Sequence, residues 1–224
     1  MISKHIIRSI FSLAVLLFAA SCQKDPDGSA PDGNNLTLQV LLPVEGGTKA
    51  TEDGEKALNE NKISTLDVFI YKEGEDACAH YQRIVPVDGM TRYGISKNRS
   101  AFAENTGYSV YVVANAGTAA AGAMSLAELK AAVVAQALNP DAVQTDLLMD
   151  GKSIATVLND GTKANKNIDV SLKRGVAKIR VNLSYGADYQ PAGQVTKKLV
   201  NYASDARVLE TGDVHMPALA TTAS

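Results

Sequence analysis

The chain is predicted to be mainly β, an antiparallel β-sandwich with one short helix. Segments of strand length recur at 36–42, 66–71, 108–114 and 168–172, and those at 66–71 and 108–114 are rich in β-branched and aromatic residues. Residues 176–183 alternate apolar and polar side chains with period two, which is typical of an antiparallel strand with one face in water. Helical spacing of apolar residues stands out only in the segment 125–138.

The first 21 residues read as an export signal. Lys4 and Arg8 supply a cationic start, residues 10–20 are apolar, and small residues precede Cys22. The apolar run is shorter than the about 20 residues that cross a bilayer, so we expect cleavage. Cys22 directly follows Ala-Ala-Ser, the pattern of bacterial lipoboxes, which predicts a lipoprotein whose Cys22 sulfur is acylated, as with palmitate. A plain signal peptide with an incidental cysteine is the alternative.

Three regions are expected after the signal. Residues 22–35 are rich in Asp, Gly, Pro and Asn without apolar periodicity, which predicts a flexible tether. Residues 36–215 form the β-sandwich domain, and its first strand, 36–42, begins with alternation and ends apolar. Residues 216–224 are a tail.

The helix is predicted from its start signal and its apolar stripe. Ser125 and Glu128 have the spacing of a capping box. The stripe runs along one face before Asn139 and Pro140, and consists of Leu126, Leu129, Val133, Ala137 and Leu138. We expect this helix to lie across the sheets, and the glycine cluster 117–122 before it to form a turn.

Few residues offer catalytic or metal-binding chemistry. His5 leaves with the signal, and neither His80 nor His215 lies in a recognisable motif. Cys78 and His80 have a spacing that could contact zinc, but no further ligands cluster beside them. The carboxylates are scattered in loops and lack the spacing of a calcium loop. We therefore predict no enzyme activity, no cofactor and no metal site.

Charge and cysteine content narrow the partners further. The net charge is −2, so no basic surplus is available for phosphates and nucleic acid is not expected as a partner. Once Cys22 is acylated, Cys78 has no disulfide partner and is interpreted as structural. The acidic residues 73–76 just before Cys78 should raise the pKa of its thiol. With no Trp, a stacking platform is poorly supported, which leaves binding through a β surface.

Three segments resemble the fimbrillin family of pilin lipoproteins, the FimA-like and Mfa-like fimbrial subunits. They are ISTLDVFIY at 63–71, YSVYVVAN at 108–115, and the stretch from MDG at 149–151 to VSLKRGVAKI at 170–179. The last segment is similar to the Met-Ser-Gly turn of the family and to its strand pair Leu-Lys-Arg-x-Val-Ala-Lys-Ile. Together with the lipobox, the segments span nearly all of 22–209 and correspond to the N-terminal domain of the family.

The resemblance implies a transthyretin-like β-sandwich whose first strand can be exchanged for a strand from another subunit. In this chain the exchanged strand would carry Leu36, Leu38, Val40 and Leu42. It also implies a lipid anchor in the outer membrane, other fimbrial subunits as partners, and a role in adhesion that includes host surface ligands. The alternative function is a surface lipoprotein that binds a glycan or host protein without polymerising.

Two departures from the family pattern leave alternatives open. Polymerising members are cut by an arginine-specific protease after the first strand, whereas this chain has Lys49 before Ala50 and no arginine between Arg8 and Arg83. Either another protease cuts between Lys49 and Ala50, or the subunit keeps its strand and lipid as an anchor. Members usually carry a C-terminal domain as well, which is expected to be absent here through truncation or because the subunit accepts a strand without giving one.

Overall fold

The computed structural model describes residues 33–43, 61–135, 146–175, 202–203, 205–209 and 219–220. These residues belong to one compact unit, Asp32–Ser224. Cys22, Lys49, Ala50 and the strand predicted at 176–183 lie outside the described residues. Within the described ranges, no helix is long and apolar enough to span a bilayer.

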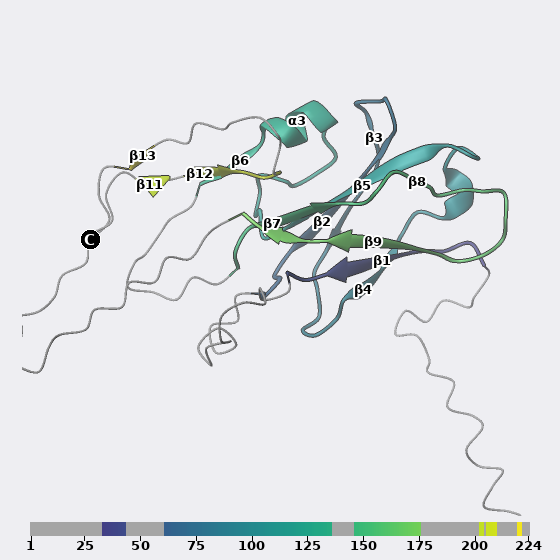
Figure 1. Cartoon of the computed structure of the whole chain (residues 1–224), viewed down its shortest axis with the longest axis horizontal. Coiled ribbons are helices and arrows are strands. Elements are labelled where there is room, and N and C mark those ends of the chain that lie inside the picture. The colour runs from purple at the N-terminus through teal and green to yellow at the C-terminus, as the bar shows by residue number, and fades with distance from the viewer. Residues whose placement is uncertain are drawn as a thin grey trace, which may run out of the picture. The chain divides into compact units, whose positions relative to one another are not determined.

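The first sheet has three strands, with β1 (Leu36–Leu41) between β4 (Arg92–Ile95) and β9 (Lys166–Ser171), as Figure 1 shows. β1 runs antiparallel to β4 and parallel to β9. The apolar and polar residues of β1 alternate, so one side of the strand is buried and the other faces outward. A strand in this central position is hydrogen-bonded along both of its edges.

The second sheet has six strands. Its order is β10 (Lys173–Arg174), β7 (Met149–Lys152), β5 (Gly107–Ala114), β2 (Leu66–Lys72) and β3 (Cys78–Ile84), and β8 (Thr156–Val157) also pairs with β5. Two small ladders accompany it, β6 (Val133–Ala135) with β12 (Asp205–Arg207) and β11 (Tyr202–Ala203) with β13 (Leu219–Ala220). Between the described strands, every ladder except β1–β9 is antiparallel, so the mainly β sandwich predicted from the sequence is confirmed.

Strands β2 and β5 carry apolar side chains on both sides, and both faces of the second sheet are covered. One face packs against the first sheet in a core that includes Leu38, Val68 and Val112. The other face packs Phe69 and Tyr71 against the segment around Leu129 and Val208. Strands buried on both faces read as continuous apolar runs, which is why 66–71 and 108–114 lack clean alternation.

One carboxylate is enclosed in this second core. Asp67 of β2 is fully buried, and both of its oxygens accept hydrogen bonds from Arg83 of β3, at 2.8 and 2.9 Å. The hydroxyl of Tyr81 donates a third bond to it at 2.8 Å. A buried charge needs such partners, so Asp67, Tyr81 and Arg83 fix the register between β2 and β3.

The chain passes from one sheet to the other between β9 and β10. Residues 166–171 pair with β1 in the first sheet, and Lys173 and Arg174 pair with Asp150 and Met149 in the second. The crossing is possible because β7 has a glycine there: a Cβ on Gly151 would overlap the carbonyl oxygen of Ser171. The prediction that residues 149–151 form a turn is wrong, since they lie in β7.

Helix α3 (Leu126–Ala131) begins as predicted but is shorter. The hydroxyl of Ser125 accepts from the Glu128 N–H at 3.1 Å, and the Glu128 carboxylate accepts from the Ser125 N–H at 2.8 Å, which completes the capping box. The helix ends after six residues, and Val133 lies in β6 instead of on the predicted helical stripe. Two successive β-branched residues favour a strand, and pairing with β12 satisfies their backbone. Ala137 and Leu138 lie outside the described residues, and residues 117–120 form a turn as predicted.

Candidate functional site

The predicted exchange site lies around β1, and its buried side chains occupy defined positions between two neighbouring strands. Leu36, Leu38 and Val40 are each no more than 1% exposed. Leu38 lies between Tyr93 of β4 and Ile168 of β9, both of which are buried. The structure therefore brings three of the four predicted residues together on one buried face.

The far end of β1 is less enclosed. Leu42 is half-buried and packs against the same core, whereas Leu41 on the opposite side is 44% exposed. The Leu41 carbonyl still accepts a hydrogen bond from the Leu172 N–H at 2.8 Å, where the chain leaves β9. The strand is thus held by apolar burial along its length and by backbone bonds to its end.

The apolar contribution of β1 is a large share of the stability of a domain. Burying a Leu or Val side chain stabilises a fold by about 1.5–3 kcal/mol. Leu36, Leu38 and Val40 together therefore contribute about 5–9 kcal/mol, against a total stability of about 5–15 kcal/mol for a typical domain. Without β1 or a replacement strand, the two sheets could not remain folded as they are.

The start of β1 is held by a polar clamp, which we define as Asn34, Asn35, Ser100 and Asn165. The Asn34 amide donates to the Ser100 hydroxyl at 2.9 Å and accepts from the Ser100 N–H at 3.2 Å. The Asn35 N–H donates to the side-chain oxygen of Asn165 at 3.1 Å. Asn34 and Asn35, which the sequence assigns to the tether, are thus bonded to the sandwich.

Arg99 bonds to both halves of the polar clamp or to the residues beside them. It lies in the 3-10 turn η1 (Arg99–Ala101), is 1% exposed, and its backbone N–H donates to the Asn34 carbonyl at 3.0 Å. Its guanidinium donates to the carbonyl oxygens of Leu158, at 2.7 Å, and Ala164. It also forms an ion pair with Asp160 at 2.6 Å. Sequence reasoning missed Arg99, because arginine is almost never fully buried unless it is paired.

The environment of Asp160 predicts an acid-sensitive contribution to stability. Hydrogen bonds from the hydroxyl and N–H of Thr162, and then Arg99, hold the pKa of Asp160 well below its ordinary value. A carboxylate with a depressed pKa stabilises the fold above its unfolded pKa, and this contribution is lost as the pH falls. The pKa of an aspartate in an unfolded chain is about 3.9, so the stabilisation by Asp160 should begin to be lost below about pH 5.

Asp160→Asn should remove this contribution to the pH dependence of stability. We expect the urea midpoint of the variant to fall less between pH 6 and pH 3 than that of the unchanged chain. Asp88→Asn, in the exposed loop before β4, is the matched control and should follow the unchanged chain. Equal pH slopes for Asp160→Asn and the unchanged chain would contradict the assignment.

Two edge strands, β3 of the second sheet and β4 of the first, are joined by side-chain hydrogen bonds. The Gln82 side chain of β3 donates to the Gly94 carbonyl of β4 at 3.1 Å and accepts from the Ser96 N–H at 2.8 Å. Lys97 donates to the Ala79 carbonyl at 2.8 Å. An edge occupied in this way is a poor template for a further strand.

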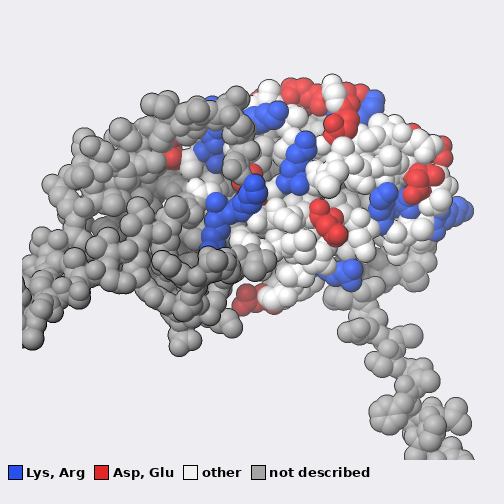
Figure 2. All heavy atoms as spheres, viewed as in Figure 1, with Lys and Arg blue, Asp and Glu red and all other residues white. Residues whose placement is uncertain are grey.

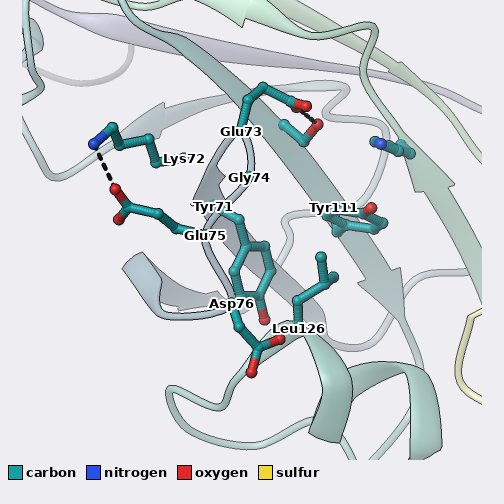
Figure 3. A pocket seen from close by; sticks show the side chains of 10 residues that line it. Tyr71, Lys72, Glu73, Gly74, Glu75, Asp76, Tyr111 and Leu126 are labelled. Atoms are coloured by element: carbon teal, nitrogen blue, oxygen red, sulfur yellow. Dashed lines mark hydrogen bonds and ion pairs between the residues drawn. The ribbon is translucent and has the colours of Figure 1, made fainter.

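A shallow pocket of about 270 Å³ lies at the turn after β2, as Figure 3 shows. Its carboxylates are already engaged. Glu75 pairs with Lys72 at 2.5 Å, Glu73 accepts from the Ser109 hydroxyl, and an oxygen of Asp76 accepts from a backbone N–H at the start of α3. Within the described ranges, no three metal-ligating side chains gather in one place.

Cys78 and His80 are two residues apart on β3, and within the described ranges they belong to no metal cluster. Burial raises the pKa of the Cys78 thiol, which donates to the His80 carbonyl at 3.1 Å. The direction agrees with the prediction, but the cause is burial and not the neighbouring acidic residues. Burial also lowers the pKa of His80.

On the face drawn in Figure 2, basic and acidic side chains of the described residues are interspersed.

The comparisons with known proteins agree with this architecture. The family model of the major fimbrial subunit protein FimA matches residues 34–201, well over half of the chain. This is a family of fimbrial structural proteins and not an enzyme family. The chain is a member of the FimA family of major fimbrial subunit proteins. A search of curated proteins found no match.

Two of the solved structures that match this chain share its fold with a TM-score above 0.5. One is a fimbrial assembly protein from Parabacteroides distasonis, with 18% identity, a TM-score of 0.57, and coverage of 84% of this chain and 72% of that chain. The other is the tip fimbrial protein Mfa3 from Porphyromonas gingivalis with C-terminal truncation, with 15% identity, a TM-score of 0.54, and coverage of 84% and 62%. This chain thus spans less than two thirds of the Mfa3 structure.

Proposed function

We propose that this chain is a fimbrial subunit that reaches the outer membrane as a lipoprotein acylated on Cys22 and assembles with other fimbrial subunits by exchange of β1, in support of adhesion. The observation that carries the proposal is the position of β1. It is a central strand with three buried apolar side chains at alternate positions, hydrogen-bonded on both edges. A strand from another subunit with the same alternation could satisfy the same backbone groups and fill the same positions.

Two modes of assembly are open to such a subunit. A cut between Lys49 and Ala50 would separate β1 and the lipid from the rest of the domain, and the vacated groove would then accept a strand. Without the cut, β1 stays in place and the subunit remains an anchor in the membrane. Both modes use the same fold and differ in the covalent connection between β1 and β2.

The test is the intact mass and N-terminal sequence of the protein from membranes and from sheared filaments. A chain that begins at Ala50 in high-mass filaments would support strand exchange after cleavage. An acylated chain that begins at Cys22 and co-purifies with filament bases would support the anchor. A monomeric chain that never associates with filaments would contradict the proposed function.

A further inference from the structure

The start of the groove makes contacts that a purely apolar strand could not satisfy. Both polar atoms of the Asn34 side chain form hydrogen bonds with a single residue, Ser100. Asn35 is held through its backbone N–H by the Asn165 side chain. These bonds bridge 66 and 130 positions of the chain, so they join β1 to two separate loops.

Both loops are held by side-chain bonds that do not involve β1. The Arg99 guanidinium bonds to Leu158, Asp160 and Ala164, and Ala164 directly precedes Asn165. Ser100 follows Arg99 in the same 3-10 turn. Arg99 is therefore a positioning residue for both halves of the polar clamp: its guanidinium bonds to the loop before Asn165, and its backbone N–H bonds to the Asn34 carbonyl.

We propose that the polar clamp selects the incoming strand. This inference rests on the proposed strand exchange and specifies its partner: a strand of another fimbrial subunit that carries Asn or Asp just before its first alternating aliphatic residues. A short side chain with two polar atoms at its tip fits Ser100, since the hydroxyl can either accept from an amide or donate to a carboxylate. The next residue must not be proline, because Asn165 binds a backbone N–H.

The clamp also fixes the direction of the incoming strand. Three aliphatic side chains at alternate positions would fit the groove in either direction, because their spacing is symmetric. The polar contacts lie at one end only, near Ser100 and Asn165. A strand that satisfies both ends therefore runs as β1 does, antiparallel to β4 and parallel to β9.

The experiment uses the full chain with residues 47–52 replaced by a site-specific protease sequence. After cleavage, a labelled peptide with the sequence of residues 33–43 is exchanged into the groove, and unlabelled peptides compete with it in a fluorescence anisotropy assay. We expect the Asn34→Ala peptide to compete roughly five- to tenfold more weakly than the unchanged peptide, because it lacks both bonds to Ser100. The Asn34→Asp peptide should stay within about twofold.

Matched variants separate a selective contact from a general loss of strand affinity. The Gln39→Ala peptide changes an outward-facing residue and should compete like the unchanged peptide. In a Ser100→Ala protein, the penalty of Asn34→Ala should shrink to about two- to threefold, since one of the two bonds is already gone. The reversed-sequence peptide should bind at least about tenfold more weakly than the unchanged one.

The outcomes distinguish the two proposals. Equal competition by the unchanged and Asn34→Ala peptides would overturn the selective clamp and leave strand exchange intact. Failure of every peptide to enter the groove, the unchanged sequence included, would overturn strand exchange itself. Weaker competition by Asn34→Ala that is the same in the Ser100→Ala protein would assign the effect to the peptide and also overturn the clamp.

Discussion

Leu38→Asp should remove a large part of the stability of the protein. The side chain of Leu38 is fully buried between Tyr93 and Ile168, in the apolar core between the sheets. The substitution removes apolar burial and introduces a carboxylate that must be desolvated or protonated, which together should cost about 4 kcal/mol or more. Urea unfolding followed by circular dichroism measures this loss, and size-exclusion chromatography would show association through the exposed sheet.

The neighbouring residue provides the control for this prediction. Thr37 lies on the opposite side of the same strand, opposite Gly94 and Asn167, and is only half-buried. Thr37→Asp therefore keeps the charge in contact with water and should cost no more than about 1 kcal/mol. If both variants were equally stable, the buried face of β1 would not hold the sandwich together, and the strand-exchange proposal would lose its physical basis.

The sequence predicted the strands whose signal is local. β1, β2, β5 and β9 lie within one or two residues of their predicted bounds, because β-branched and aromatic runs report a buried pleated surface without knowledge of the partner strand. The capping box located the start of α3 for the same reason. The end of that helix was mispredicted, because Val133 pairs with β12 in strand β6 instead of continuing the helix. That pairing joins residues about seventy positions apart, so no local pattern reveals it.

The features that shape the candidate site depend on contacts that the sequence does not encode locally. Alternation predicted which side of β1 is buried, but not that its partner β9 is parallel, since pairing across 130 positions leaves no local pattern. Asn34 and Asn35 resemble any polar residues of a tether until Ser100 and Asn165 are brought beside them. Burial of Arg99 is equally invisible, because its acceptors are mostly backbone carbonyls.

Gly151→Ala should be nearly as damaging as the charge in β1, although it adds a single methyl group. A Cβ at this position would overlap the carbonyl oxygen of Ser171 and lie 2.9 Å from a methyl carbon of Val170. The obstacle is backbone at the point where the chain crosses between the sheets, so it cannot rotate away as a side-chain end can. Overpacking typically costs 1–3 kcal/mol, and we expect about 3 kcal/mol or more here.

Gly107→Ala is the matched control, because it adds the same methyl group to another strand of the same sheet. Its Cβ would meet only the flexible side chain of Glu73, at 3.3 Å, so the loss of stability should stay below about 1 kcal/mol. The comparison cancels the general preference of strands for residues other than glycine. A Gly151→Ala protein as stable as the control would mean that β7 and the crossing after β9 can separate without loss. In that case the close approach at Gly151 would not be what holds β9, and with it one edge of the β1 groove, against the second sheet.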